Sequence, residues 1–210
     1  MKAILYAAAV ALFVSGSALA QSPTWGPGAS DAAFADMLRT SFRDRNAVKV
    51  DRLQQDETQA FCSDPIAAAA PANAKRAEAI EQANLATVKF PADGQYLGDW
   101  RRGETIAQSG RGLTWTDGAT QVSGGNCYNC HQISGTEISY GTLGPSLLGY
   151  GKLRGTGADV LRATWAKIYN SKSSNACSNM PRAGHMGILN EAQLKDLMAL
   201  LLDPESPVNK

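Results

Sequence analysis

Residues 127–131 read Cys127-Tyr128-Asn129-Cys130-His131, and this stretch decides the fold. Two thiols three positions apart, followed at once by an imidazole, form the pattern of covalent c-type haem attachment. Each thiol adds to one vinyl group of the porphyrin, so Cys127 and Cys130 must lie a short helical step apart. His131 then lies under the iron and supplies the proximal nitrogen. The stretch predicts one covalently attached haem c, tethered by the two cysteines.

A zinc half-site and a redox dithiol are the two other readings of this stretch. A zinc site needs four ligands and usually a second cysteine pair of the same kind, which the sequence lacks. A redox Cys-x-x-Cys is typical of a βαβ context, which the sequence does not suggest. The chain has four Cys and two His, and three of these six residues fall in the one pentapeptide. We therefore favour haem attachment.

The first 20 residues have the features of a secretory signal peptide. Lys2 supplies the positive start, residues 3–14 are mostly apolar, and residues 18–20 (Ala-Leu-Ala) form a small-x-small cleavage site. The apolar run is short for a membrane span, which makes an uncleaved anchor the less favoured alternative. We expect the mature protein to begin near Gln21, in the oxidising bacterial periplasm, with no membrane span.

The charged residues balance once Lys2 is removed, because 19 Lys and Arg then face 19 Asp and Glu. A neutral chain has no bulk charge to attract nucleic acid or an anionic membrane. We therefore expect no nucleic-acid partner.

The composition changes at Pro91, and we divide the chain there. Residues 1–20 are the expected signal peptide, residues 21–91 an N-terminal extension, and residues 92–210 a haem domain. The expected fold class is all-α: a small class I-like c-type cytochrome domain with a mainly helical N-terminal extension.

Two helices are expected in the extension, from apolar residues at helical spacing. Asp31 caps a helix that runs to about Arg43, and a second helix covers about residues 73–88. The first helix is expected to bury one apolar stripe, formed by Phe34, Met37, Leu38 and Phe42.

Three longer helices are expected in the haem domain, besides a short one that opens at the haem motif. They cover residues 97–109, residues 160–169 with Asp159 as the N-cap, and a last helix that follows Asn190. In the last helix Asn190 and Gln193 fit a capping box. Packing of the first of these helices against the last, around a haem, is the plan of the small c-type cytochromes.

The second axial ligand of the iron is expected from the chain after the motif. A thioether is softer than an imidazole, favours the reduced iron and raises its potential. Met180 lies in a loop that Pro181 restricts, far enough along the chain to reach the other face of the haem. Met198 lies on the apolar stripe of the last helix and is expected in the core. We expect Met180 as the ligand, with His185 and Met186 as open alternatives.

Two cysteines, Cys62 and Cys177, lie outside the haem motif. In an oxidising compartment such a pair most simply forms a disulfide. This disulfide would tie the extension to the loop just before Met180. A free thiol and an intermolecular bridge stay open as alternatives.

Several other residues have two readings each. The Pro145 carbonyl accepts a hydrogen bond from His131 Nδ1–H or belongs to a plain turn. Arg182 pairs with a haem propionate or lies solvated at the surface. Trp115 and Tyr150 line the haem or pack in the core.

The haem domain resembles the SoxX family, the monohaem cytochrome subunits of the bacterial SoxAX sulfur-oxidation complex. The likeness covers roughly residues 92–208, and at Ala183 the family pattern is expected to have an aromatic residue. The resemblance rests on the haem motif and, in order, on residues 141–147 (Gly-Thr-Leu-Gly-Pro-Ser-Leu), 167–171 (Lys-Ile-Tyr-Asn-Ser) and 175–182 (Asn-Ala-Cys-Ser-Asn-Met-Pro-Arg).

This resemblance implies an electron-transfer subunit of an L-cysteine S-thiosulfotransferase. The SoxA-like partner, which forms a heterodimer with this subunit, carries the catalytic haem with a cysteine ligand. The complex oxidatively joins thiosulfate to a cysteine of a carrier protein in the periplasm. The resemblance further implies that a haem held by Cys127, Cys130, His131 and Met180 takes the electrons and passes them to an external cytochrome c. On this reading the chain has no catalytic residue of its own.

A free-standing periplasmic monohaem electron shuttle is the alternative function. It would use the same haem and the same ligands, but it would make only small, transient contacts with other proteins. A haem enzyme acting alone is a third possibility. It needs an open position on the iron, which a firm Met180 ligand argues against.

Overall fold

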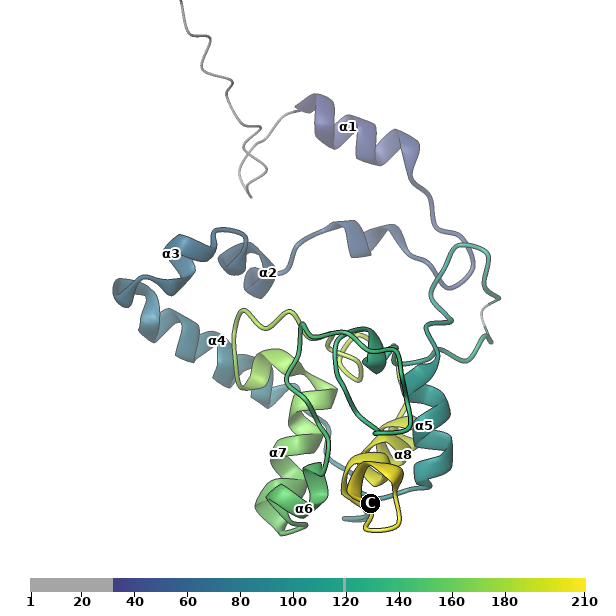
Figure 1. Cartoon of the computed structure of the whole chain (residues 1–210). Coiled ribbons are helices and arrows are strands. Elements are labelled where there is room, and N and C mark those ends of the chain that lie inside the picture. Colours follow the sequence, from purple (N-terminus) through teal and green to yellow (C-terminus); the bar gives the residue numbers. More distant parts are fainter. Residues whose placement is uncertain (1–31, 119) are drawn as a thin grey trace, which may run out of the picture.

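The computed structural model describes residues 32–118 and 120–210, and this part of the chain is built from helices and loops (Figure 1). Its only β-type pairing within these ranges is an isolated bridge between Arg45 and Val48. The predicted all-α fold class is confirmed. The α-helices are α1 (Ala32–Ser41), α2 (Glu57–Cys62), α3 (Pro65–Ala69), α4 (Ala74–Ala86), α5 (Trp100–Gln108), α6 (Tyr150–Arg154), α7 (Ala158–Tyr169) and α8 (Glu191–Leu202). The 3-10 helices are η1 (Val50–Leu53), η2 (Pro71–Asn73), η3 (Cys127–Asn129), η4 (Ser171–Ser173) and η5 (Pro207–Asn209).

The predicted signal peptide (residues 1–20) and the predicted cap Asp31 lie outside the described residues. Among the helices that the structure does describe, none has the length and apolar character needed to cross a membrane.

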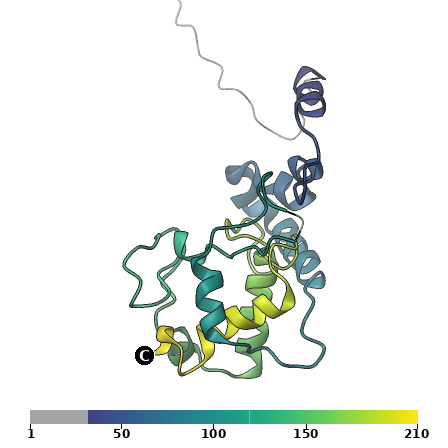
Figure 2. The ribbon, with the colours of Figure 1, turned by 90° about the vertical axis from the view of Figure 1, so that its right-hand side faces the viewer.

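Helices α5 and α8 pack against each other at the centre of the haem domain (Figure 2). Gly103 and Ala107 are buried on α5, and a Cβ built at Gly103 would lie 3.0 Å from the Cβ of Leu200 on α8. Glycine therefore allows the two backbones to come close. Arg102 adds two hydrogen bonds of 2.8 Å to the buried carboxylate of Asp196. The predicted packing of the first haem-domain helix on the last is confirmed.

The N-terminus of α8 has the predicted capping box. Asn190 Oδ1 accepts from the Gln193 amide at 2.9 Å, and Gln193 Oε1 accepts from the Asn190 amide at 3.1 Å. These contacts satisfy two amides that the helix itself cannot pair. Met198 is fully buried on this helix, so its predicted place in the core is confirmed.

Helix α7 begins earlier than the sequence predicted. Its N-cap is Gly157, whose ψ of 159° is extended, and Asp159 is the second residue of the helix. The prediction of Asp159 as the cap is therefore wrong. An acidic side chain in the first turn still interacts favourably with the helix dipole. Trp165 is buried on this helix and donates from Nε1 to the Lys89 carbonyl at 2.8 Å.

The extension packs against the haem domain through α2 and α4. Helix α1 lies away from these two helices and from the helices of the haem domain (Figure 1). Phe61 and Ile80 form a small second core with Ala176. The prediction of a buried stripe on α1 is wrong for three of its four residues. Leu38 is half-buried, and the other three, Phe34, Met37 and Phe42, are exposed.

Candidate haem site

The haem motif forms a single 3-10 turn, η3. The amides of Cys130 and His131 both donate to the Cys127 carbonyl, at 3.1 Å and 2.9 Å. This turn is the short helical step that the spacing of the motif predicted. Cys127 and Cys130 are half-buried free thiols, and Tyr128 between them is buried. Burial raises the pKa of the Cys127 thiol to about 11, so before haem attachment this group is protonated at neutral pH.

The ring of His131 is held in one orientation. Its Nδ1 lies 2.8 Å from the Pro145 carbonyl oxygen. Because a carbonyl can only accept, Nδ1 carries the proton and Nε2 keeps its lone pair for a metal. A Cβ built at Gly144 would lie 2.5 Å from Nδ1 and 2.7 Å from Nε2, so only glycine fits beneath the ring. Of the two readings of Pro145, the hydrogen bond to His131 is the one that the structure has, and the donor set fits a covalently attached haem.

Met180 has a fixed backbone at the edge of the core. Ser171 Oγ donates to the Met180 carbonyl at 2.5 Å, and Ser178 Oγ accepts from the Met180 amide at 3.2 Å. The half-buried Met180 side chain packs against the main core cluster, and Cys127 packs against the same cluster. Met180 and the haem motif thus border one body of apolar side chains. Its ligation of the iron stays a prediction.

The two rival ligands are placed differently. His185 and Met186 are both exposed, and neither belongs to the main core cluster. Partial desolvation and the neighbouring Arg182 charge lower the pKa of His185. Ala183, where the family pattern is expected to have an aromatic residue, is buried in the main core cluster. Met180 alone of the three packs against the main core cluster, and the choice among them stays a prediction.

Arg182 is 7% exposed and pairs with Asp56 of the extension at 2.6 Å. The reading of Arg182 as a solvated surface residue is therefore wrong. Tyr150 donates or accepts a 2.9 Å hydrogen bond with Thr164, and Trp115 is exposed. No local pattern in the sequence points to Asp56 as a partner, because the two residues lie 126 positions apart.

Glu104 lies beside the haem motif, although no pattern in the sequence points to it. Tyr128, between the two motif cysteines, donates from its hydroxyl to Glu104 Oε1 and Oε2 at 2.9 Å and 3.1 Å. Burial raises the pKa of the Glu104 carboxyl, and Glu137 nearby acts in the same direction. Burial and the Glu104 contact likewise raise the pKa of the Tyr128 hydroxyl. The partnership places a carboxyl of α5 beside the haem-binding turn.

An all-α fold with a Cys-x-x-Cys-His turn and an oriented histidine defines a c-type cytochrome. A family model described as cytochrome c matches residues 115–203. The chain is also 40% identical, over 159 residues, to an uncharacterized lipoprotein of Aquifex aeolicus (strain VF5). That match covers 74% of this chain and 73% of the relative. Residues 115–203 thus form a cytochrome c domain, and its cofactor is covalently bound haem c.

The family match begins at residue 115, inside the predicted haem domain. The division of the chain at residues 91 and 92 stays a prediction.

Proposed function

We propose that this cytochrome c transfers single electrons through one haem, which Cys127 and Cys130 tether and which His131 and Met180 ligate. Haem c supplies a one-electron iron couple. The observation that carries the proposal is the His131–Pro145 contact, which leaves Nε2 free and points to a permanent axial ligand. The carbonyl also increases the basicity of the ring, because it accepts the Nδ1 proton.

Met180 would fill the other axial position and leave no site on the iron for a substrate. Its backbone is held from both sides by Ser171 and Ser178. A six-coordinate iron with a thioether ligand suits electron transfer rather than catalysis at the iron. The catalytic chemistry then belongs to a partner protein.

We further propose that the chain is the electron-transfer subunit of a periplasmic L-cysteine S-thiosulfotransferase. The resemblance of the haem domain to the SoxX family supports this role. In the proposed reaction a SoxA-like haem subunit joins the outer sulfur of thiosulfate to the sulfur of a carrier-protein cysteine. The thiol proton and two electrons leave, and this chain takes the electrons one at a time and passes them to an external cytochrome c.

Apolar side chains at the surface of the extension support a subunit rather than a free shuttle. Met37 and Phe42 on and after α1 are 42% and 47% exposed, and Val50 and Leu53 of η1 are also exposed. A stable heterodimer buries such residues, whereas a shuttle needs only small contacts. Export of the protein is supported by the signal-like first 20 residues and by the relative named as a lipoprotein.

Purification of the protein from its native periplasm under mild conditions tests the subunit role. We expect co-elution with a second haem protein in a fixed ratio. Thiosulfate added with the carrier protein should then reduce the haem of this chain, and a carrier with its cysteine replaced by serine should give no reduction. A lone monohaem species at high protein concentration would favour the free-standing shuttle.

A further inference from the structure

The segment that contains Met180 is held by the extension and not by the haem domain alone. We call residues 170–182 the methionine loop; it runs from the end of α7 through η4 to Arg182. Contacts from α2, from its N-cap and from the region of α4 reach this loop at its start, its middle and its end. They come from residues 56–87 of the chain, more than 80 positions away in sequence.

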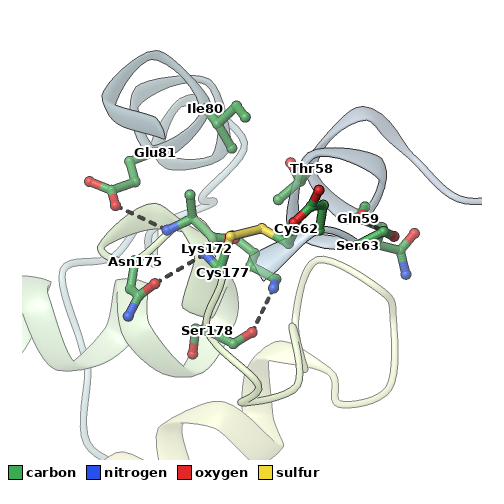
Figure 3. The surroundings of a disulfide bond; sticks show 12 residues. Thr58, Gln59, Cys62, Ser63, Ile80, Glu81, Lys172, Asn175, Cys177 and Ser178 are labelled. Carbon is green, nitrogen blue, oxygen red and sulfur yellow. Dashed lines mark hydrogen bonds between the residues drawn. A yellow bond between two sulfur atoms is a disulfide. The ribbon is translucent and has the colours of Figure 1, made fainter. Parts of the chain in front are cut away.

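The middle of the methionine loop is joined to α2 by the disulfide between Cys62 and Cys177, so the predicted intramolecular pairing is confirmed (Figure 3). The Ala176 amide beside it donates to Glu81 Oε1 of α4 at 3.0 Å. Lys172 donates from Nζ to the Ser178 carbonyl at 2.6 Å, within the loop. The segment just before Met180 is thus attached to two helices of the extension.

The start of the loop is attached through buried amides. Asn170 is fully buried, and its Nδ2 donates to Asn84 Oδ1 and to Thr87 Oγ1, at 3.0 Å each. Asn84 in turn donates to Thr58 Oγ1 of α2 at 3.0 Å. A buried polar network of this kind is costly to open, because each group left unpaired loses its hydrogen bond and has no water molecule to replace the partner.

The end of the loop is attached by charge. Buried Arg182, two residues after Met180, pairs with Asp56, and the same carboxylate caps α2 by accepting from the Gln59 amide at 2.8 Å. Burial raises the pKa of the Asp56 carboxyl. The Gln59 amide and the Arg182 charge outweigh this effect and together hold that pKa below its ordinary value. Separating the two residues would leave a buried cation without its partner.

We propose that residues 56–87 position the axial methionine. In this role the Cys62–Cys177 disulfide and the Asp56–Arg182 pair shift the opening equilibrium of the methionine loop toward its closed state. This inference rests on the proposed ligation by Met180. The physical need is plain, since a soft thioether binds oxidised iron weakly and a mobile loop would lose the ligand in each oxidised cycle. Anchors on both sides of Met180 lower the entropy that ligation must otherwise overcome.

The test compares ligand exchange at the ferric haem, with imidazole as the probe. In the wild-type protein imidazole enters only when the methionine loop opens. A C62S/C177S double variant removes the disulfide without leaving an odd thiol that pairs with the haem cysteines. We expect its imidazole binding rate to rise about tenfold, which corresponds to ~1.4 kcal/mol in the opening equilibrium. Amide exchange in peptides from residues 170–182 should rise in parallel.

Asp56→Asn is the second variant, and it keeps the experiment decisive if the double variant does not fold. Asparagine still caps α2 but removes the charge that faces Arg182. Asn209→Ala is the matched control. It breaks buried hydrogen bonds to Leu201 and Asp203 near the C-terminus, so it lowers thermal stability away from the methionine loop.

Faster imidazole binding in C62S/C177S or D56N than in N209A supports the positioning role. Rates no higher than that of N209A in both variants overturn it, because loss of global stability would then explain the change. Met180→Ala separates the two proposals. If the near-infrared Met–Fe(III) band disappears in M180A while the two variants behave like N209A, the ligand assignment stands and only the positioning role fails.

Discussion

Gly144→Ala tests the cradle that orients His131. The added Cβ would lie 2.5 Å from Nδ1 and 2.7 Å from Nε2 of the imidazole, whereas ordinary contacts of carbon are about 3.5–4.0 Å. The ring must therefore move by about 1 Å or the Gly144–Pro145 turn must shift. Either movement stretches the 2.8 Å contact between Nδ1 and the Pro145 carbonyl.

The expected magnitude follows from the cost of overpacking. Such insertions cost about 1–3 kcal/mol. For a protein of this size each kcal/mol lowers the melting temperature by about 2–4 °C, so G144A should melt ~2–12 °C below the wild type. The assay is thermal unfolding of the ferric holoprotein, followed by absorbance and circular dichroism. The reduction potential of G144A, measured alongside, should also change, because the proximal histidine loses its fixed hydrogen bond.

Gly135→Ala is the matched control, since a Cβ at Gly135 meets no atom within 4 Å and its φ is not in the left-handed region. If G144A and G135A share one melting temperature and one reduction potential, the cradle argument is refuted.

Three further predictions concern the packing of the helices and the extension. Asn190→Ala should lower the free energy of unfolding by about 0.5–2 kcal/mol in urea titrations, because the Gln193 amide loses its cap; an unchanged midpoint would contradict this role. Gly103→Ala would place a Cβ 2.2 Å from the backbone oxygen of Asp196 on α8, so its overpacking cost should lie at the upper end, about 3 kcal/mol. About 1 kcal/mol gained in helix propensity leaves a net loss of roughly 2 kcal/mol, and an unchanged melting temperature would count against the close packing. Because the pKa of Asp56 is lowered in the folded protein, the stability that it adds over D56N should be complete above the ordinary carboxyl pKa and should vanish as the pH falls through the lowered value. A stability difference between wild type and D56N that persists in strong acid would rule out the Asp56 contribution.

The sequence predicted the features that depend on residues close to one another in the chain. The Cys127–His131 spacing predicted a short turn, and the structure has one. Asn190 and Gln193 predicted a capping box, because both partners lie within one helical turn. Pro145 follows His131 by only 14 positions, and its carbonyl role was one of two readings.

The failures arose where a long-range partner decides the outcome. Helical spacing on α1 predicted an apolar stripe, but no pattern in the sequence says whether another element covers it. The reading of Arg182 as a surface residue is wrong because its partner Asp56 lies 126 positions away in the chain, beyond the reach of any local pattern. Aspartate is a good N-cap, so the sequence favours Asp159, but the extended Gly157 takes the cap position two residues earlier.

The near-infrared spectrum of the ferric protein tests the central claim most directly, in the wild type, in Met180→Ala and in Met186→Ala. Ligation by His131 and Met180 predicts a Met–Fe(III) charge-transfer band in the wild type and in M186A, and its loss in M180A. A band that persists in M180A, or that is absent from the wild type, would contradict the account.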